Sequence, residues 1–274
     1  MTLSQILSMA GYELRVGFRN RWVVTAISIL TIFAVVLALA GSAPTGSTAI
    51  DPLIVLTVSL VSLTVYVVPL LALLLAFDAF AGERERGTLA LLLTYPVGRP
   101  AIVLGKFAGH SVILGCAIAI GFGIAAGLVL FDKGASAAGI AALVRLVATA
   151  TLLGMVFLAL GYVLSAVVRQ TATAAALAIG LWLGLVVLFD LALLSALVAD
   201  DGGVFTKHVF PWLLVGNPAD GFRLFNMASL PEGGSAIGSA LAHGPSPLAA
   251  LAGLAAWTGA ALLLAVASVR RIEP

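Results

Sequence analysis

Charged residues are scarce in this chain, and their scarcity decides its class. Asp, Glu, Lys and Arg make up 9% of the 274 residues, whereas hydrophobic residues make up 62% and the mean hydropathy is +1.18. Soluble globular domains carry about 25% charged residues, so the sequence predicts an integral membrane protein. The formal net charge of +2 and the lack of a basic run argue against nucleic acid as a partner.

Cysteine and the common catalytic motifs are also missing or rare. The single cysteine, Cys116, excludes an intramolecular disulfide and a metal cluster built from the cysteines of one chain. The sequence has no G-x-x-x-x-G-K-[ST] for binding ATP, no H-E-x-x-H and no G-x-S-x-G. We therefore expect that this chain is not an enzyme and binds no cofactor of its own.

What the chain does have is long apolar segments. A membrane-spanning helix needs about 20 apolar residues, and six segments meet this length. We therefore expect an all-α integral membrane protein with a single domain, 1–274. The expected spans are 22–40, 53–76, 102–130, 143–168, 172–197 and 248–269.

The first span follows a segment with helical periodicity. Leu3, Leu7, Leu14 and Phe18 recur at helical spacing with polar residues between them, which predicts an amphipathic helix within 1–21 that lies along the membrane surface. The stretch 38–40 resembles the cleavage site of a signal peptide, but the preceding apolar part is too long for one. We interpret it as a retained span.

Basic residues are distributed unevenly between the two sides of this arrangement. Cytoplasmic loops carry the excess of Lys and Arg, so both termini and the segment 77–100 are expected on the cytoplasmic side of the membrane. The side with more basic residues carries Arg15, Arg19, Arg21, Arg84, Arg86, Arg99, Lys106, Arg169, Arg270 and Arg271. The other side carries Lys133, Arg145, Lys207 and Arg223.

The segment 77–100 holds the densest group of charges. Glu83, Arg84, Glu85 and Arg86 would be costly in hydrocarbon, so we expect them in water. The apolar residues after them, 87–95, begin at a glycine and end before a proline, which predicts one short helix. An apolar helix at a charged membrane exit is a candidate docking site for a soluble partner.

The segment 200–247 is the longest stretch outside the spans, and its prolines and aromatic residues predict short helices that dip into the outer membrane interface. His208, Met227 and His243 lie in it, and they are weak candidates for copper ligands. Asp190, an acid inside the fifth span, is a candidate for lining a pathway. Lys106 and His110 are interpreted as anchors at the inner membrane interface.

Three stretches resemble a known family. Residues 82–99, GERERGTLALLLTYPVGR, resemble the pattern after the second span of ABC-2 type permeases, the membrane subunits of ATP-binding-cassette transporters. The short turn 168–174, VRQTATA, and the outer stretch 217–226, NPADGFRLFN, support this resemblance, which covers nearly the whole chain. Within the family, the sequence is most similar to permeases that help mature the copper enzyme nitrous oxide reductase.

The resemblance implies a location in the inner membrane of a bacterium, and several partners. A cytoplasmic ATPase subunit, which holds ATP and Mg²⁺, would dock on a coupling helix, and two copies of this chain would form the membrane core among lipids. A periplasmic copper-site assembly protein would rest on 200–247, where re-entrant helices precede the last span. The residues implied in ATPase docking are Glu83, Arg84, Glu85, Arg86, Gly87, Thr88, Leu89, Leu92 and Tyr95.

One departure from the family bears on this docking site. Many members have an acidic residue where this chain has Ala90. We therefore expect apolar docking through Leu89 and Leu92 in place of an ionic contact.

Several functions remain open at this point. The leading hypothesis is a permease that converts ATPase closure into movement of the spans, exporting a sulfur species, copper, or another small or lipid-like molecule. A second is a mechanotransmitter, which passes motion to an outer partner without transporting cargo. A third is an intramembrane enzyme that uses Asp190 or the region of Glu83.

Overall fold

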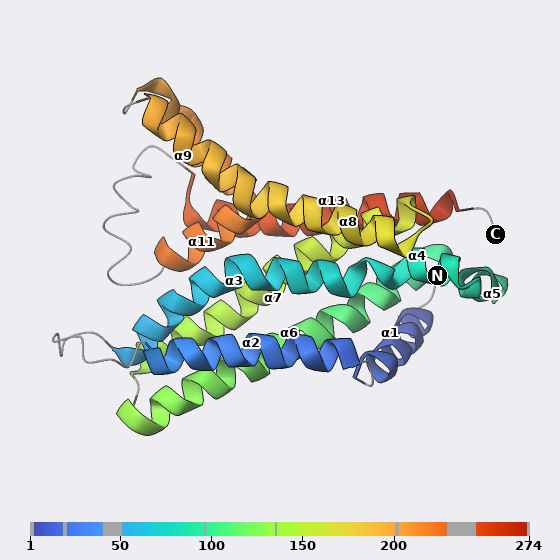
Figure 1. The fold of residues 1–274 in the computed structure, drawn as a ribbon, viewed down its shortest axis with the longest axis horizontal. Coiled ribbons are helices and arrows are strands. Elements are labelled where there is room, and N and C mark those ends of the chain that lie inside the picture. Colours follow the sequence, from blue (N-terminus) through green and yellow to red (C-terminus); the bar gives the residue numbers. More distant parts are fainter. Residues whose placement is uncertain are drawn as a thin grey trace.

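The computed structural model is built of helices (Figure 1). It describes residues 3–18, 21–40, 51–95, 97–134, 136–200, 203–228 and 245–272, and within these ranges it contains no strand. The result confirms the expected all-α class.

Among the residues that the structure describes, six helices are long and apolar enough to cross a membrane, as the sequence predicted. They are α2 (Arg21–Ala40), α3 (Pro52–Ala76) with its extension α4 (Asp78–Glu85), α6 (Arg99–Lys133), α7 (Ala137–Val167), α8 (Thr171–Trp182) with its extensions, and α13 (Pro247–Arg270). The extensions of α8 are a π-helical segment, η1 (Leu183–Leu188), and α9 (Phe189–Asp200).

The core lies where α3 packs along α7. Leu60 and Val65 of α3 and Leu153 and Phe157 of α7 have no exposed surface. Both helices are apolar on all sides, which is typical of helices that are buried among other helices or in lipid. Pro69 does not interrupt α3, and the chain first leaves the helix at Phe77.

The two ends of the bundle carry different elements (Figure 1). Both termini, α1 (Leu3–Phe18), α4 and α5 (Thr88–Thr94) lie at one end, called here the α5 end. The tip of α9 and α11 (Pro218–Ala228) lie at the opposite end, called the α11 end. Before α11 come η2 (Phe205–Val209) and α10 (Phe210–Gly216), which confirms short helices within 203–228.

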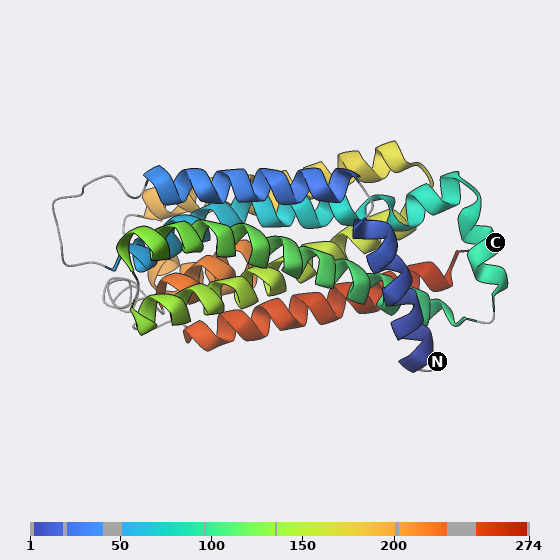
Figure 2. The same cartoon turned by 90° about the horizontal axis from the view of Figure 1, so that it is seen from below.

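Helix α1 crosses the bundle steeply and packs on α6 (Figure 2). A Cβ at Gly105 would come within 2.5 Å of Met9 Cβ, and a Cβ at Gly109 within 2.7 Å of Glu13 Cβ. Two glycines one turn apart therefore let α1 approach closely, as small residues do between membrane helices. Leu3 and Leu7 are exposed on α1 and are free to contact lipid.

Candidate functional site

Helix α5 is set apart from α4 by a glycine turn. Gly87 has φ +72°, in the left-handed region that glycine adopts at no steric cost. The helix runs from Thr88 to Thr94 and is followed by Tyr95 in an extended conformation. The short helix predicted for 87–95 is therefore present, at the α5 end of the bundle.

The exposed apolar side chains of α5 differ from those expected. Leu89 is 3% exposed and belongs to the core, and Leu92 is half-buried against the same core. Leu91 is 65% exposed, and Tyr95, just after the helix, is 64% exposed. Leu89 therefore faces the core, and among the residues of 87–95 whose side chains the structure describes, Leu91 and Tyr95 are the exposed apolar ones.

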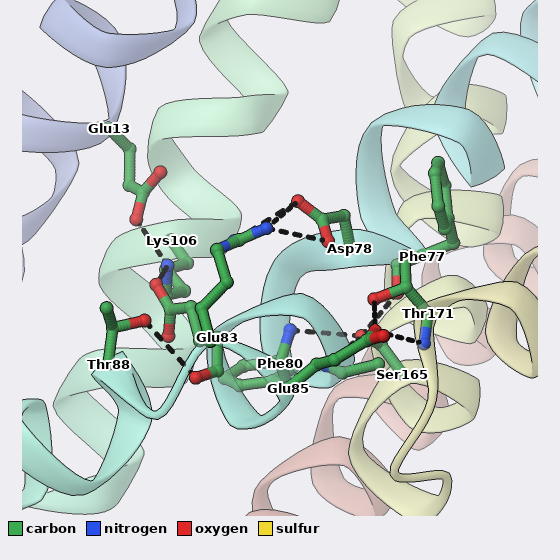
Figure 3. A network of polar contacts seen from close by, with 12 residues as sticks. Glu13, Phe77, Asp78, Phe80, Glu83, Glu85, Thr88, Lys106, Ser165 and Thr171 are labelled. Carbon is green, nitrogen blue, oxygen red and sulfur yellow. Dashed lines mark hydrogen bonds and ion pairs between the residues drawn. The ribbon is translucent and has the colours of Figure 1, made fainter.

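Ser165 of α7 forms hydrogen bonds to the backbone where α3 ends and α4 begins (Figure 3). Its Oγ accepts hydrogen bonds from the backbone N–H groups of Phe80 and Ala81, both at 3.0 Å, and donates to the carbonyl oxygen of Phe77 at 2.7 Å. The first N–H groups of a helix have no partner within that helix. One buried hydroxyl therefore caps α4 and ties it to α7.

The end of α4 is joined to the connection between α7 and α8. Glu85 Oε2 accepts hydrogen bonds from the backbone N–H of Thr171, at 3.0 Å, and from its hydroxyl, at 2.5 Å. This places a carboxylate at the N-terminus of α8, where the helix dipole favours negative charge. Arg84 Nη1 donates to the carbonyl oxygen of Val168 at 3.0 Å, so α4 contacts both ends of this turn.

A buried lysine joins α4 to α6 and α1. Lys106 of α6 is 3% exposed, and its Nζ lies 2.5 Å from Glu13 Oε1 and 2.7 Å from Glu83 Oε1 (Figure 3). Buried charges are tolerated when they are paired and hydrogen-bonded. The three side chains come from α1, α4 and α6, so this ion cluster fastens three helices at one point.

The ion cluster continues into an aromatic group. His110 Nε2 lies 3.5 Å from Glu13 Oε2, and His110 Nδ1 lies 2.7 Å from the hydroxyl of Tyr162. With the proton on Nε2, the imidazole can donate to Glu13 and accept from Tyr162. Tyr162 has no exposed surface and packs edge-on against Phe80 of α4, with ring centroids 5.3 Å apart.

The charge of Glu13 is stabilised by these neighbours. Burial acts to raise the pKa of this carboxyl, but the hydrogen bond from His110 and the charge and hydrogen bond of Lys106 outweigh it and lower the pKa from 4.5 to about 2. Glu13 is therefore ionised at neutral pH and available as the partner of Lys106.

Three of the four charged residues between 83 and 86 thus bond to other helices or turns of this chain. Glu83, Arg84 and Glu85 each bond to another helix or turn of this chain. Arg86 instead pairs with Asp78 of the same helix at 3.3 Å, with 57% of its side chain exposed. Together with Gly87 and Thr88, which are also exposed, Arg86 remains accessible to a partner.

Lys106 and His110 correct the sequence interpretation. They were expected as interfacial anchors, but both are buried, at 3% and 8% exposure. Their role depends on Glu13 and Glu83, which are distant in sequence. One feature of the sequence indicates that Glu13 faces the bundle. Glu13 shares a face of α1 with the small residues Ala10 and Gly17, and this face packs on the bundle.

The residues singled out near the α11 end fall into two groups. Asp190 pairs with Arg223 of α11 at 3.2 Å. His208 is exposed, Met227 is half-buried, and His243 lies outside the described residues. Within the described ranges, no three His, Cys, Asp or Glu side chains meet in a way that could hold a metal ion.

The comparisons with known proteins agree with this architecture. A family model described as "ABC-2 family transporter protein" matches residues 7–271. The "Probable ABC transporter permease protein NosY" of Stutzerimonas stutzeri is 44% identical over 98% of this chain and 99% of its own length. The protein of the same name from Pseudomonas aeruginosa is 42% identical over 97% and 98%. Since the family match spans almost every residue, the chain belongs to the ABC-2 family of transporter proteins.

Proposed function

We propose that this chain is a permease subunit that is driven by a separate ATPase subunit. The ATPase docks on α5 through Leu91 and Tyr95, beside Arg86, in the cytoplasm. ATP and Mg²⁺ bind to that subunit, and this chain binds neither. Two copies of the chain, each with its ATPase, form the complex in the bacterial inner membrane, with both termini on the cytoplasmic side.

The bonds made by α4 carry this proposal. Helix α4 follows α3 after one residue, precedes α5 by a two-residue turn, and is bonded to α6, α7 and α8. Through Lys106 of α6 it is also connected to Glu13 of α1. A partner that pulls α5 therefore pulls an element that is fastened to most of the bundle. Small shifts at one site become larger rearrangements when packed elements move as units.

The biological role is proposed from the relatives. Proteins named NosY are 42% and 44% identical to this chain. We propose that the complex serves assembly of the copper-sulfur site of nitrous oxide reductase, with a periplasmic assembly protein resting on 200–247. The cargo would be a sulfur species or copper.

A mechanotransmitter without cargo is the second candidate. Three buried threonines of the spans favour it, because the hydroxyls of Thr57, Thr64 and Thr258 each bond to a carbonyl oxygen of their own helix, four residues back. Large side chains such as Phe122 and Phe157 fill the space between the spans. Such a bundle is suited to passing motion to an outer partner.

The docking proposal is tested by purifying the complex from membranes and identifying the polypeptides that accompany this chain. We expect a subunit with a nucleotide-binding P-loop, and we expect Leu91→Asp or Tyr95→Asp to abolish its recovery. Phe131→Asp is the matched control, because Phe131 is 97% exposed at the other end of α6 and should leave recovery unchanged. Full recovery of the ATPase with both docking variants would contradict the proposal.

The choice between permease and mechanotransmitter needs a second measurement. The purified complex, placed in lipid vesicles with ATP, is assayed for movement of copper or sulfide across the membrane. ATP-dependent movement supports a permease. ATP hydrolysis without movement, together with an ATP-dependent change in binding of the periplasmic partner, supports a mechanotransmitter.

A further inference from the structure

Helix α11 is fastened to the fifth span at a π-helical segment. The side-chain oxygen of Asn217 accepts from the backbone N–H of Ala219 at 2.8 Å, which caps the start of α11. Its side-chain nitrogen donates to the carbonyl oxygen of Leu185 in η1, also at 2.8 Å. A π-helical turn leaves backbone groups without their usual partners and is frequent at functional sites.

One turn further along, two acids share one arginine. Arg223 Nη1 lies 3.2 Å from Asp190 Oδ2, which is in the first turn of α9, and 3.1 Å from Asp220 Oδ1, which is in α11. If both acids were ionised, the group would carry a net charge of −1. The Asp220 side chain is 2% exposed, so the excess charge would be largely removed from water.

Asp220 has an oxygen that the ion pairs leave unused. Asp220 Oδ2 is buried and receives no hydrogen bond from the residues that the structure describes. The carboxyl groups of Asp190 and Asp220 both contact Arg223 Nη1, at 3.2 and 3.1 Å, so the two acids are neighbours. Two carboxylates repel each other, but a carboxylic acid donates to a carboxylate, so one added proton would satisfy the unused oxygen.

We propose that Asp190 and Asp220 form a proton-binding site in which a single shared proton and Arg223 make the group electrically neutral. The proton joins α11 to α9, because it turns the repulsion between the two acids into a hydrogen bond. Loss of the proton weakens this contact and frees α11 to move. The site lies at the opposite end of the bundle from α5 and is independent of the docking surface there.

The charges around the site agree with this assignment. Burial raises the pKa of Asp220, the negative charge of Asp190 and its hydrogen bond raise it further, and Arg223 opposes them, so that the pKa of Asp220 reaches about 7. Helices α10 and α13 bring no titratable side chain to this end of the bundle. The other titratable groups on the described elements around α9 and α11 are Tyr66 of α3, Arg145 of α7, Asp200 of α9, and Lys207 and His208 of η2.

The test is a pH titration of the purified full chain, followed by the infrared C=O stretching band of protonated carboxylic acids. The wild type is expected to lose such a band with a midpoint near pH 7. Asp220→Asn should remove this component, whereas Asp132→Asn, which changes an exposed acid at the end of α6, should leave it unchanged. Absence of the band in the wild type at pH 6, or its persistence in Asp220→Asn, overturns the proposal.

A second variant distinguishes proton sharing from a simple buried acid. Asp190→Asn replaces the like charge by an amide that can donate to Asp220 Oδ2. The midpoint should therefore fall by about 1 pH unit or more. An unchanged midpoint would show that Asp190 is not part of the site. A midpoint that depends on the concentration of Na⁺ or K⁺ at constant ionic strength would indicate a metal cation in place of the proton, and would also overturn the proposal.

Discussion

Lys106 and Glu83 form an ion pair of 2.7 Å although they lie on different helices, α6 and α4, with the whole of α5 between them in the sequence. The same Lys106 Nζ contacts Glu13 of α1 at 2.5 Å. The pair therefore closes the loop that contains the candidate docking helix and fastens it to the surface helix α1.

Replacing Lys106 should break the ion cluster. Lys106→Met leaves Glu13 and Glu83 as buried carboxylates without their cation, and breaking a buried pair from one side costs about 3 to 5 kcal/mol. We expect a large drop in the unfolding temperature of the purified protein and loss of ATP-driven activity in the complex. For the unfolding temperature, Arg86→Met is the matched control, since the exposed pair of Arg86 with Asp78 contributes less than about 1 kcal/mol.

The triple variant Lys106→Met, Glu13→Gln, Glu83→Gln provides the rescue. It removes the uncompensated charges together with the lysine, so it should recover much of the stability that Lys106→Met loses. If the single variant were as stable as the wild type, the ion cluster would not fasten the three helices.

The contact between α1 and α6 should respond to one added methyl group. In Gly109→Ala the new Cβ would lie 2.7 Å from Glu13 Cβ and 3.0 Å from the carbonyl oxygen of Ala10. The helix α1 must then shift, which lengthens the bond from Glu13 to Lys106. Gly123→Ala has no atom within 4 Å of its Cβ, so it should be neutral or stabilise α6 by up to about 1 kcal/mol. Equal unfolding temperatures for the two variants would contradict this packing.

Loss of the Ser165 hydroxyl should destabilise the protein more than loss of the hydroxyl of an exposed serine in a span. Ser165→Ala leaves the N–H groups of Phe80 and Ala81 buried without a partner, and each such loss costs about 1 to 3 kcal/mol. The control is Ser195→Ala, because Ser195 is exposed and its hydroxyl bonds only to the carbonyl oxygen of Leu191 in its own helix. Thermal unfolding and hydrogen exchange at Phe80 measure the difference. Unchanged hydrogen exchange at Phe80 in Ser165→Ala would contradict the claim that Ser165 caps α4.

Acid should weaken the attachment of α1. The pKa of Glu13 is lowered from 4.5 to about 2 in the folded chain. A lowered pKa contributes stability that is fully present above pH 4.5 and is lost as the pH falls toward 2. The unfolding temperature should therefore decrease over this window in the wild type, with a smaller decrease in Glu13→Gln. The same slope in both proteins would count against Glu13 as the source.

At the α11 end, stability should instead be lost as the pH rises. The pKa of Asp220 is raised from 3.8 to about 7, so its contribution to stability is fully present below pH 3.8 and is lost as the pH rises through 7. Asp220→Asn imitates the protonated acid and should remove this dependence between pH 6 and pH 8. A wild type whose stability is constant over this range would contradict the raised pKa.

The sequence was sufficient for the features that depend on local pattern. The length of the apolar segments predicted the six spans, and an apolar run between a glycine and a proline predicted α5. It could not provide the partners of buried charges, because Glu13, Glu83 and Lys106 meet only after three helices have packed. The same limit explains Leu89: its apolar character is evident, but its direction into the core depends on how α5 lies against the bundle.

The central claim is that α5, α4 and α1 move as one body. In the complex with its ATPase and a Cys116→Ser background, spin labels at Tyr12→Cys of α1 and Thr94→Cys of α5 report one distance, and Thr94→Cys with Leu248→Cys of α13 reports a second. All three positions are exposed. On addition of ATP we predict that the second distance changes while the first stays constant, and that Lys106→Met makes the first distance change as well. A first distance that changes in the wild type as much as in Lys106→Met would contradict the claim.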